Sequence, residues 1–323
     1  MSGGVPRPLR HHPVEKRPYL VEVTTRCIQG RLLLRPSTQV NKVVLGVIGR
    51  ALALYRDVKL VDFVILGNHY HIKLLIEDEG GLARFMEFVN GKLSDRIGTR
   101  LHDWRGAMWE TRYKAMPIID DPSMQDRLKY VWSNGVKEGF VASPLDWPGA
   151  SSVRARLLGE KLIGYWYHEA EISAARLRGN PVDPEDFVTK YEIELAPLPC
   201  LDDLDDDEYL RRATEIVREI EREAGARHAD KGTQPLGADF VLQQDPHTRP
   251  RKSARRRAPL CHASSRKTRK AYRKLHMEFS RTYYERSDAV LAGERGVEFP
   301  SWCFPPARPF VRPGGRLKPR EPP

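Results

Sequence analysis

Two apolar runs joined by a short turn constrain the fold of this chain more than any other feature. Residues 58–66 (VKLVDFVIL) and 69–77 (HYHIKLLIE) are rich in β-branched and aliphatic residues, and Gly67-Asn68 separates them. A two-residue connection with glycine first predicts an antiparallel hairpin with a type II′ turn. Side chains two apart on a strand share a face. The second run therefore predicts a core face made of Tyr70, Ile72, Leu74 and Ile76.

The opposite face of the second strand carries His69, His71 and Lys73. Two neutral imidazoles side by side form a half-site for a divalent metal ion. A lysine on the same face suits an anionic substrate such as a phosphate. A His-x-His pair is a weak motif alone, so the interpretation needs a further ligand, a nucleophile and a suitable fold.

The remaining patterns of the first 140 residues predict an α+β fold. The expected elements are a strand at 19–27, a helix from a Ser37 or Thr38 cap to about residue 56, a helix at 81–102, a strand at 109–119 and a helix at 121–139. With the hairpin, the order is βαββαβα, which is the ferredoxin-like split βαβ arrangement plus one helix. In that antiparallel sheet the third strand is central, so the two histidines are expected in mid-sheet.

Composition changes divide the chain into five expected segments. They are a basic arm (1–17), the α+β domain (18–155), a helical extension (156–225), a linker (226–262), and a basic helix with a proline-rich tail (263–323). The C-terminal region is expected to be mostly helical and partly disordered.

Charge favours a polyanionic partner, nucleic acid first. The 323 residues carry a formal net charge of +11, and residues 249–274 contain twelve Lys or Arg and no acid. No apolar run is long enough for a transmembrane helix, and the first residues lack an apolar signal core. The four scattered cysteines support neither a zinc finger nor a disulfide scaffold. A cytoplasmic, nucleoid-associated protein is the expectation.

A tyrosine and an amide on the last helix of the domain complete a candidate site. Tyr130 and Asn134 are four residues apart and project from one helical face. If that face covers His69 and His71, two imidazoles and one amide oxygen leave open positions for water and phosphate oxygens. That donor set suits Mg²⁺ or Mn²⁺, and a structural zinc site would need a fourth protein ligand.

Four ordered blocks resemble the single-tyrosine HUH transposases of bacterial insertion sequences, and most of all their REP-associated branch. The blocks are GNHYH (67–71), WETRY (109–113), YVWSNGVKEGFV (130–141) and WPGASS (147–152), and the resemblance spans about residues 15–155. One departure is Gly135, where the family often has proline.

The resemblance implies a ferredoxin-like catalytic domain that cleaves and rejoins single-stranded DNA with hairpin or palindromic structure. It makes His69 and His71 the metal ligands, Asn134 the polar residue that completes the metal site, and Tyr130 the nucleophile. Attack of Tyr130 on a phosphodiester gives a 5′-phosphotyrosine and a free 3′-hydroxyl, which a second strand can reverse. Both swapped dimers and monomers are expected in such a family, so either oligomeric state is compatible.

The DNA-binding residues expected from type and position are Lys73, Trp109, Arg112, Arg255, Arg256, Arg257, Lys267 and Lys270. For tryptophans, packing is the main alternative to base stacking. Two other functions stay open at this point. One is a domesticated protein that binds repeated palindromes without cleaving them, and the other is a metal-dependent phosphodiesterase that uses water in place of Tyr130.

Overall fold

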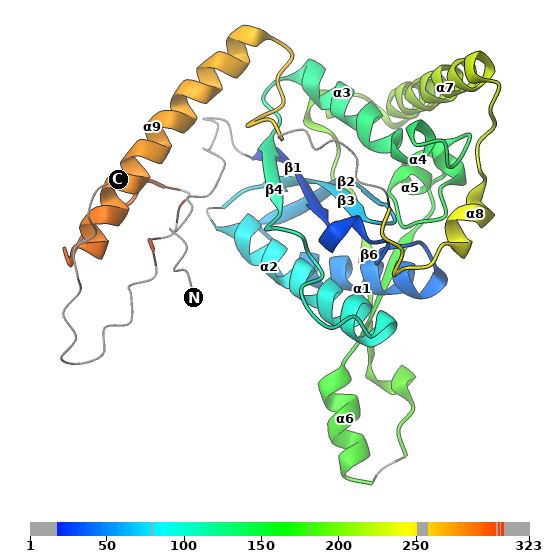
Figure 1. The fold of residues 1–323 in the computed structure, drawn as a ribbon, viewed down its shortest axis with the longest axis horizontal. Coiled ribbons are helices and arrows are strands. Elements are labelled where there is room, and N and C mark those ends of the chain that lie inside the picture. Colours follow the sequence, from blue (N-terminus) through cyan, green and yellow to red (C-terminus); the bar gives the residue numbers. More distant parts are fainter. Residues whose placement is uncertain are drawn as a thin grey trace.

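A four-stranded antiparallel sheet with strand order β2-β3-β1-β4 lies at the centre of the structure, and helices cover both of its faces (Figure 1). The computed structural model describes residues 18–78, 80–179, 181–250, 258–301, 303 and 305–306. The main elements are β1 (Tyr19–Arg26), α1 (Thr38–Leu54), β2 (Val58–Ile65), β3 (His69–Ile76), α2 (Gly81–Leu93), a π-helical segment (Ser94–Leu101), β4 (Lys114–Pro117), α3 (Asp121–Trp132), α4 (Asn134–Lys137), α5 (Val153–Leu158), β5 (Leu162–Tyr167), α6 (Glu169–Leu177), β6 (Val188–Ile193), α7 (Asp206–Lys231), α8 (Ala238–Gln243) and α9 (Arg266–Leu291).

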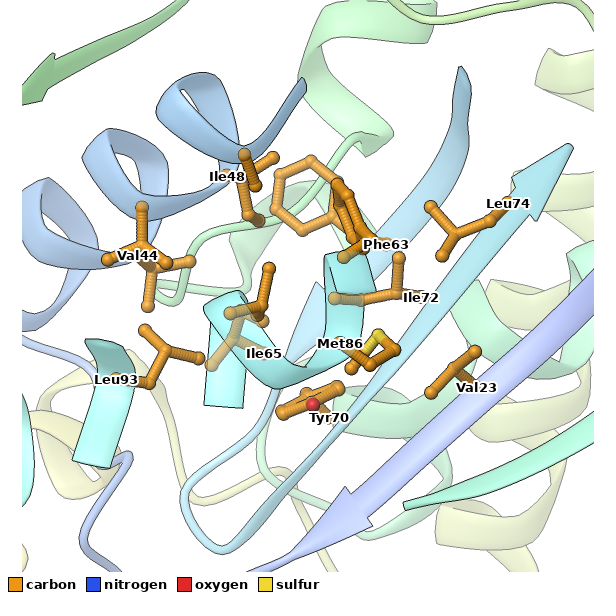
Figure 2. Close-up of a cluster of buried hydrophobic side chains, with 14 of the residues drawn as sticks. Val23, Val44, Ile48, Phe63, Ile65, Tyr70, Ile72, Leu74, Met86 and Leu93 are labelled. Carbon is orange, nitrogen blue, oxygen red and sulfur yellow. The ribbon is translucent and has the colours of Figure 1, made fainter. Parts of the chain in front are cut away.

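The first face of the sheet forms the main core against α1 and α2. Figure 2 shows Phe63, Tyr70 and Ile72 of the sheet facing side chains of these two helices. All four residues of the expected core face of β3 are buried, which confirms that prediction. Strand β3 pairs with β1 on one side and β2 on the other, so the histidine-bearing strand is internal as expected.

The second face is also covered, by α3, α4 and α7. Its apolar cluster joins Val64 and Leu75 of the sheet to Val131 of α3 and Ile216 of α7. A β-bulge in β2 lies between Leu60 and Asp62. Both faces of β3 are therefore interior over most of its length, and only its start, at His69, is partly exposed.

The secondary structure of the first 140 residues follows the predicted order with local differences. Ser37 caps α1 by accepting a hydrogen bond from the Val40 amide. The predicted turn type was wrong: Gly67 does not have the positive φ that a type II′ turn requires at its first central position. The strand expected at 109–119 is reduced to β4, with Trp109 in an isolated bridge to Cys27.

The C-terminal half contains a second sheet that the sequence analysis did not expect. Strands β5 and β6 form a two-stranded antiparallel sheet beside α1, and α6 lies between them in the chain. A Cβ at Gly46 would lie 2.2 Å from the Tyr165 carbonyl oxygen, so only glycine permits this contact. The segment expected as a linker contributes the end of α7 and all of α8, whose Val241 is buried. Within the residues described, no helix is both long and apolar enough to cross a membrane.

Candidate active site

The two histidines of β3 lie together, with one nitrogen of each ring already used. Their ring centroids are 5.2 Å apart. His69 Nδ1 lies 2.7 Å from Asn68 Oδ1, and His71 Nδ1 lies 2.8 Å from Glu22 Oε1. A carboxylate can only accept, so His71 Nδ1 carries a proton, and in the neutral ring Nε2 keeps its lone pair. In the same way, the Asn68 amide oxygen accepts from His69 Nδ1, so the Nε2 atoms of both neutral rings can bind a metal ion.

Glu22 on β1 is the residue that orients His71. Its side chain is fully buried and accepts two hydrogen bonds from Arg127, at 2.7 Å from Nε and 2.6 Å from Nη2. Burial alone would raise the pKa of this carboxyl, but the hydrogen bonds from His71 and Arg127 lower it well below its usual range. Glu22 is thus an ionised anchor beneath one metal-ligand candidate, an arrangement that fixes ring orientation in metal sites.

His69 is held in its neutral form. Burial is the main cause that lowers the pKa of His69 well below 6.5, and the positive charges of Arg26 and Lys137 act in the same direction. A neutral imidazole is the form that binds a metal ion, so no proton has to be displaced from His69 near neutral pH.

Tyr130 on α3 faces the histidine pair. Its ring meets that of His71 edge to face, with centroids 5.7 Å apart, and the residue is 39% exposed. The ring lies between two cations, with Arg127 Cζ 3.7 Å and Lys137 Nζ 3.4 Å from its centroid. The phenol is therefore next to the imidazoles, accessible from solvent and surrounded by positive charge.

The helix expected at 121–139 divides after Trp132, and side chains at the break explain why. Ser133 Oγ and Asn134 Nδ2 both donate to the Tyr130 carbonyl, and Asn134 Nδ2 also donates to Val131. Such local bonds compete with helical ones and end α3 at Trp132. Asn134 is 1% exposed and its amide nitrogen is engaged within its own turn. Its oxygen is therefore the atom left to serve as a ligand.

Gly135 occupies a position that a larger residue would disturb. A Cβ at Gly135 would lie 2.5 Å from the Trp147 ring. Trp147 in turn donates from Nε1 to the Ile65 carbonyl at 2.9 Å. The glycine thus allows the turn after Tyr130 to lie directly against a buried tryptophan.

The position of Lys73 does not fit the expected contact with DNA. Its side chain is fully buried, and Nζ lies 2.7 Å from Asp62 Oδ2. Trp132 also donates to Asp62, at 2.9 Å, so this tryptophan is a packing residue rather than a base-stacking one. Alternation placed Lys73 on the histidine face correctly, but α3 and its neighbours cover that face.

Four of the other expected DNA-binding residues line two grooves that do not include Tyr130. Arg112 is exposed, and Trp109 donates from Nε1 to Asn90 at 3.0 Å; both line a groove of about 720 Å³ beside α2. Lys267 and Lys270 are exposed on α9 and line a separate groove with further lysines and arginines. The expected contacts at Arg255, Arg256 and Arg257 lie outside the described residues.

Four residues of the site were not expected from the sequence: Glu22, Arg127, Lys137 and His262. Arg127 lies one turn before Tyr130, a spacing that could have drawn attention to it. His262 comes from the segment expected as a linker, which pairs with the edge of β4 through Ile118. Its Nε2 lies 3.7 Å from Glu22 Oε2, and burial lowers its pKa to about 4. Nothing in the local sequence indicated that this segment returns to the sheet.

The donor set around His69 and His71 is compatible with a divalent metal ion that keeps open positions. In the part of the chain described, no group of three or more His, Cys, Asp or Glu side chains could hold a metal. The two Nε2 atoms alone are an incomplete shell, which fits a catalytic metal that keeps open positions better than a structural one.

Comparison with known proteins gives distant structural likenesses to transposases. No protein-family model matches the sequence, and no curated protein matches it. A REP-associated tyrosine transposase bound to a REP hairpin is 17% identical with a TM-score of 0.39, over 46% of this chain and 85% of that one. A Deinococcus radiodurans R1 protein described as a transposase is 12% identical with a TM-score of 0.27, over 41% of this chain and 94% of that one. At these values neither likeness supports a statement about function.

Proposed function

We propose that this protein is a single-strand DNA endonuclease and strand transferase, a transposase of the single-tyrosine type, with Tyr130 as its nucleophile. The observation that carries the proposal is the 5.7 Å separation between the rings of Tyr130 and His71, beside a second histidine with a free Nε2. A solvent-accessible phenol beside two imidazoles and two cations suits attack on a phosphodiester better than it suits a packed core.

The fold supports the same proposal. The strand order β2-β3-β1-β4, with α1 and α2 on one face, is the order expected for the ferredoxin-like arrangement. In this arrangement β3 brings the histidines to the middle of the sheet, and the helix after β4 brings Tyr130 over them. Two of the four sequence blocks that resemble single-tyrosine transposases, at 67–71 and 130–141, supply these same residues.

The proposed reaction is the one that the sequence resemblance implies, a transfer of the phosphate to Tyr130. Tyr130 Oη loses its proton to solvent and forms a bond to phosphorus. The P–O3′ bond breaks, and the 3′-oxygen takes up a proton from solvent and leaves as a 3′-hydroxyl. The 5′-phosphate stays on Tyr130, so the energy of the cleaved bond is conserved. Attack on this linkage by the 3′-hydroxyl of another strand regenerates the tyrosine and joins the two DNA ends.

The metal site has an orienting and an electrophilic part in this proposal. His69 and His71 would hold Mg²⁺ or Mn²⁺ through Nε2, with the Asn134 oxygen as a third ligand. When bound, the ion supplies Lewis-acid stabilisation of charge on a non-bridging phosphate oxygen. Glu22 keeps the His71 ring in the orientation that presents Nε2.

The substrate class is single-stranded DNA with hairpin or palindromic structure, as the sequence resemblance implies. The exposed lysines of α9 supply positive charge outside the site. That charge would also serve a protein that only binds DNA, so the experiment must separate binding from chemistry.

A covalent adduct assay makes that separation. Full-length protein is incubated with a set of labelled hairpin oligonucleotides and Mn²⁺, and protein–DNA adducts stable in SDS are counted. Tyr165→Phe is the matched control, because Tyr165 is also 39% exposed but lies on β5. The wild type and Tyr165→Phe should form the adduct and Tyr130→Phe should not.

The remaining outcomes identify the alternatives. DNA cleavage without an adduct would indicate a water-dependent phosphodiesterase. Binding without cleavage or adduct by the wild type would indicate a DNA-binding protein, and an adduct in Tyr130→Phe would exclude Tyr130 as the nucleophile.

A further inference from the structure

Lys137 on α4 carries a positive charge that the described residues leave without a hydrogen-bonding partner. Its Nζ lies 3.4 Å from the centroid of the Tyr130 ring, is shielded from solvent and has no hydrogen bond. A buried ammonium without hydrogen bonds is costly, because it loses its water shell without replacement. Attraction to the face of one aromatic ring offsets only part of that cost.

The other cations around the site show the difference. Arg127 also lies over the Tyr130 ring, but its guanidinium is paired with Glu22. Lys73 is buried and paired with Asp62. Lys137 therefore provides the uncompensated charge nearest to the nucleophile, beside the neutral ring of His69.

The backbone around Lys137 is firmly held. Its amide donates to the Ser133 carbonyl at 2.7 Å, and Val136 is buried in the second apolar cluster. Gly139, with φ of 76°, ends the turn. The lysine thus projects from a fixed base, and its flexible four-carbon stem is the part that can move Nζ from the ring face to the ring edge.

We propose that Lys137 is a catalytic residue that binds the scissile phosphate. In this step Nζ leaves the ring face and donates a hydrogen bond to a non-bridging oxygen of the phosphodiester at the Tyr130 hydroxyl. No proton or bond is transferred to or from Lys137: the Oη–P bond forms and the P–O3′ bond breaks while the ammonium stays charged. The inference rests on the proposed function for the identity of the phosphodiester.

An NMR titration tests the contact without requiring activity. Full-length protein labelled with ¹⁵N on its lysine side chains is titrated with the dinucleotide dTpdT, and then with its uncharged methylphosphonate analogue. The Lys137 Nζ signal is assigned by its loss in Lys137→Arg. Lys129 is the internal control, because it adjoins Tyr130 in sequence but is paired with Glu219 and Glu223 on α7.

The expected result is a saturable shift of the Lys137 signal with dTpdT, no such shift with the analogue, and no shift at Lys129. A Lys137 signal that does not move, or that moves equally with the uncharged analogue, would overturn the inference. This readout is separate from the proposed function, since a phosphate contact can be present or absent whether or not an adduct forms.

Adduct formation gives a second measurement once the wild type is shown to react. Removing one hydrogen-bond donor to a group that gains charge in the transition state costs about 10²–10³ in rate. Lys137→Met should therefore slow adduct formation about 100-fold, Lys137→Arg should recover part of the loss, and Lys129→Met should react like the wild type. Thermal melting checks that Lys137→Met folds. Wild-type rates for a folded Lys137→Met would show that Lys137 only packs on the tyrosine ring.

Discussion

Replacing Glu22 by glutamine should weaken metal binding and destabilise the protein together, because this carboxylate holds both His71 and Arg127. Glu22 is fully buried and Arg127 is only 17% exposed at the side chain, so the pair is desolvated. Breaking one partner of a buried ion pair typically costs about 3–5 kcal/mol of unfolding free energy. Glutamine can still accept one hydrogen bond from Arg127, which places the expected loss near the lower limit, about 3 kcal/mol.

The effect on metal binding follows from the Glu22–His71 contact of 2.8 Å. Loss of such an orienting partner usually lowers metal affinity about 10–100-fold. Isothermal titration of the full-length protein with Mn²⁺, combined with urea unfolding, measures both effects. Glu160→Gln is the control, because it breaks an exposed pair with Arg154 and should change neither quantity. Wild-type Mn²⁺ affinity in a folded Glu22→Gln protein would refute the role given to Glu22.

Three further changes test separate parts of the structure. The pKa of His262 is about 4 in the folded protein and about 6.5 in an unfolded chain, so the unfolded state binds more protons between these pH values. The unfolding free energy should therefore fall by up to about 3 kcal/mol as the pH falls from 6.5 to 4. Urea titrations at each pH measure this profile, and His262→Gln should flatten it. Gly135→Ala should cost about 1–3 kcal/mol because its Cβ would lie 2.5 Å from the Trp147 ring, and an unchanged urea midpoint would contradict this contact. Replacing Lys267 and Lys270 by glutamine should reduce the slope of log K against log salt for single-stranded DNA by about 1.4, and an unaltered slope would show that α9 does not contact phosphates.

Much of the first sheet could be predicted, because the alternation of apolar side chains along a strand can be seen within a few consecutive residues. The alternation in 69–77 placed Tyr70 on the core face and His71 on the opposite face, as observed. Lys73 obeyed the same alternation, yet it is buried. Whether a face of a strand meets solvent or helices depends on the packing of segments that are distant in sequence, here α3 and α7. The alternation of side chains along one strand does not indicate that packing.

The candidate site could be predicted only in part, because some of its residues come from elements that are distant in sequence. Helical spacing and the motif blocks identified Tyr130 and Asn134, while the supporting network came from elements far apart in the chain. Glu22 is 105 residues from Arg127 in sequence and joins it only through the folded sheet. His262 reaches this network because its segment pairs with β4, a contact that its polar sequence does not specify.

The most direct test of the account is to locate the DNA linkage on the protein. After reaction with hairpin DNA and Mn²⁺, nuclease and trypsin treatment would release residues 130–137 as one peptide, in which Tyr130 is the only tyrosine. The account predicts that mass spectrometry finds a nucleotide phosphate on Tyr130 in this peptide. A nucleotide on another tyrosine, or DNA cleavage that leaves this peptide unmodified, would contradict it.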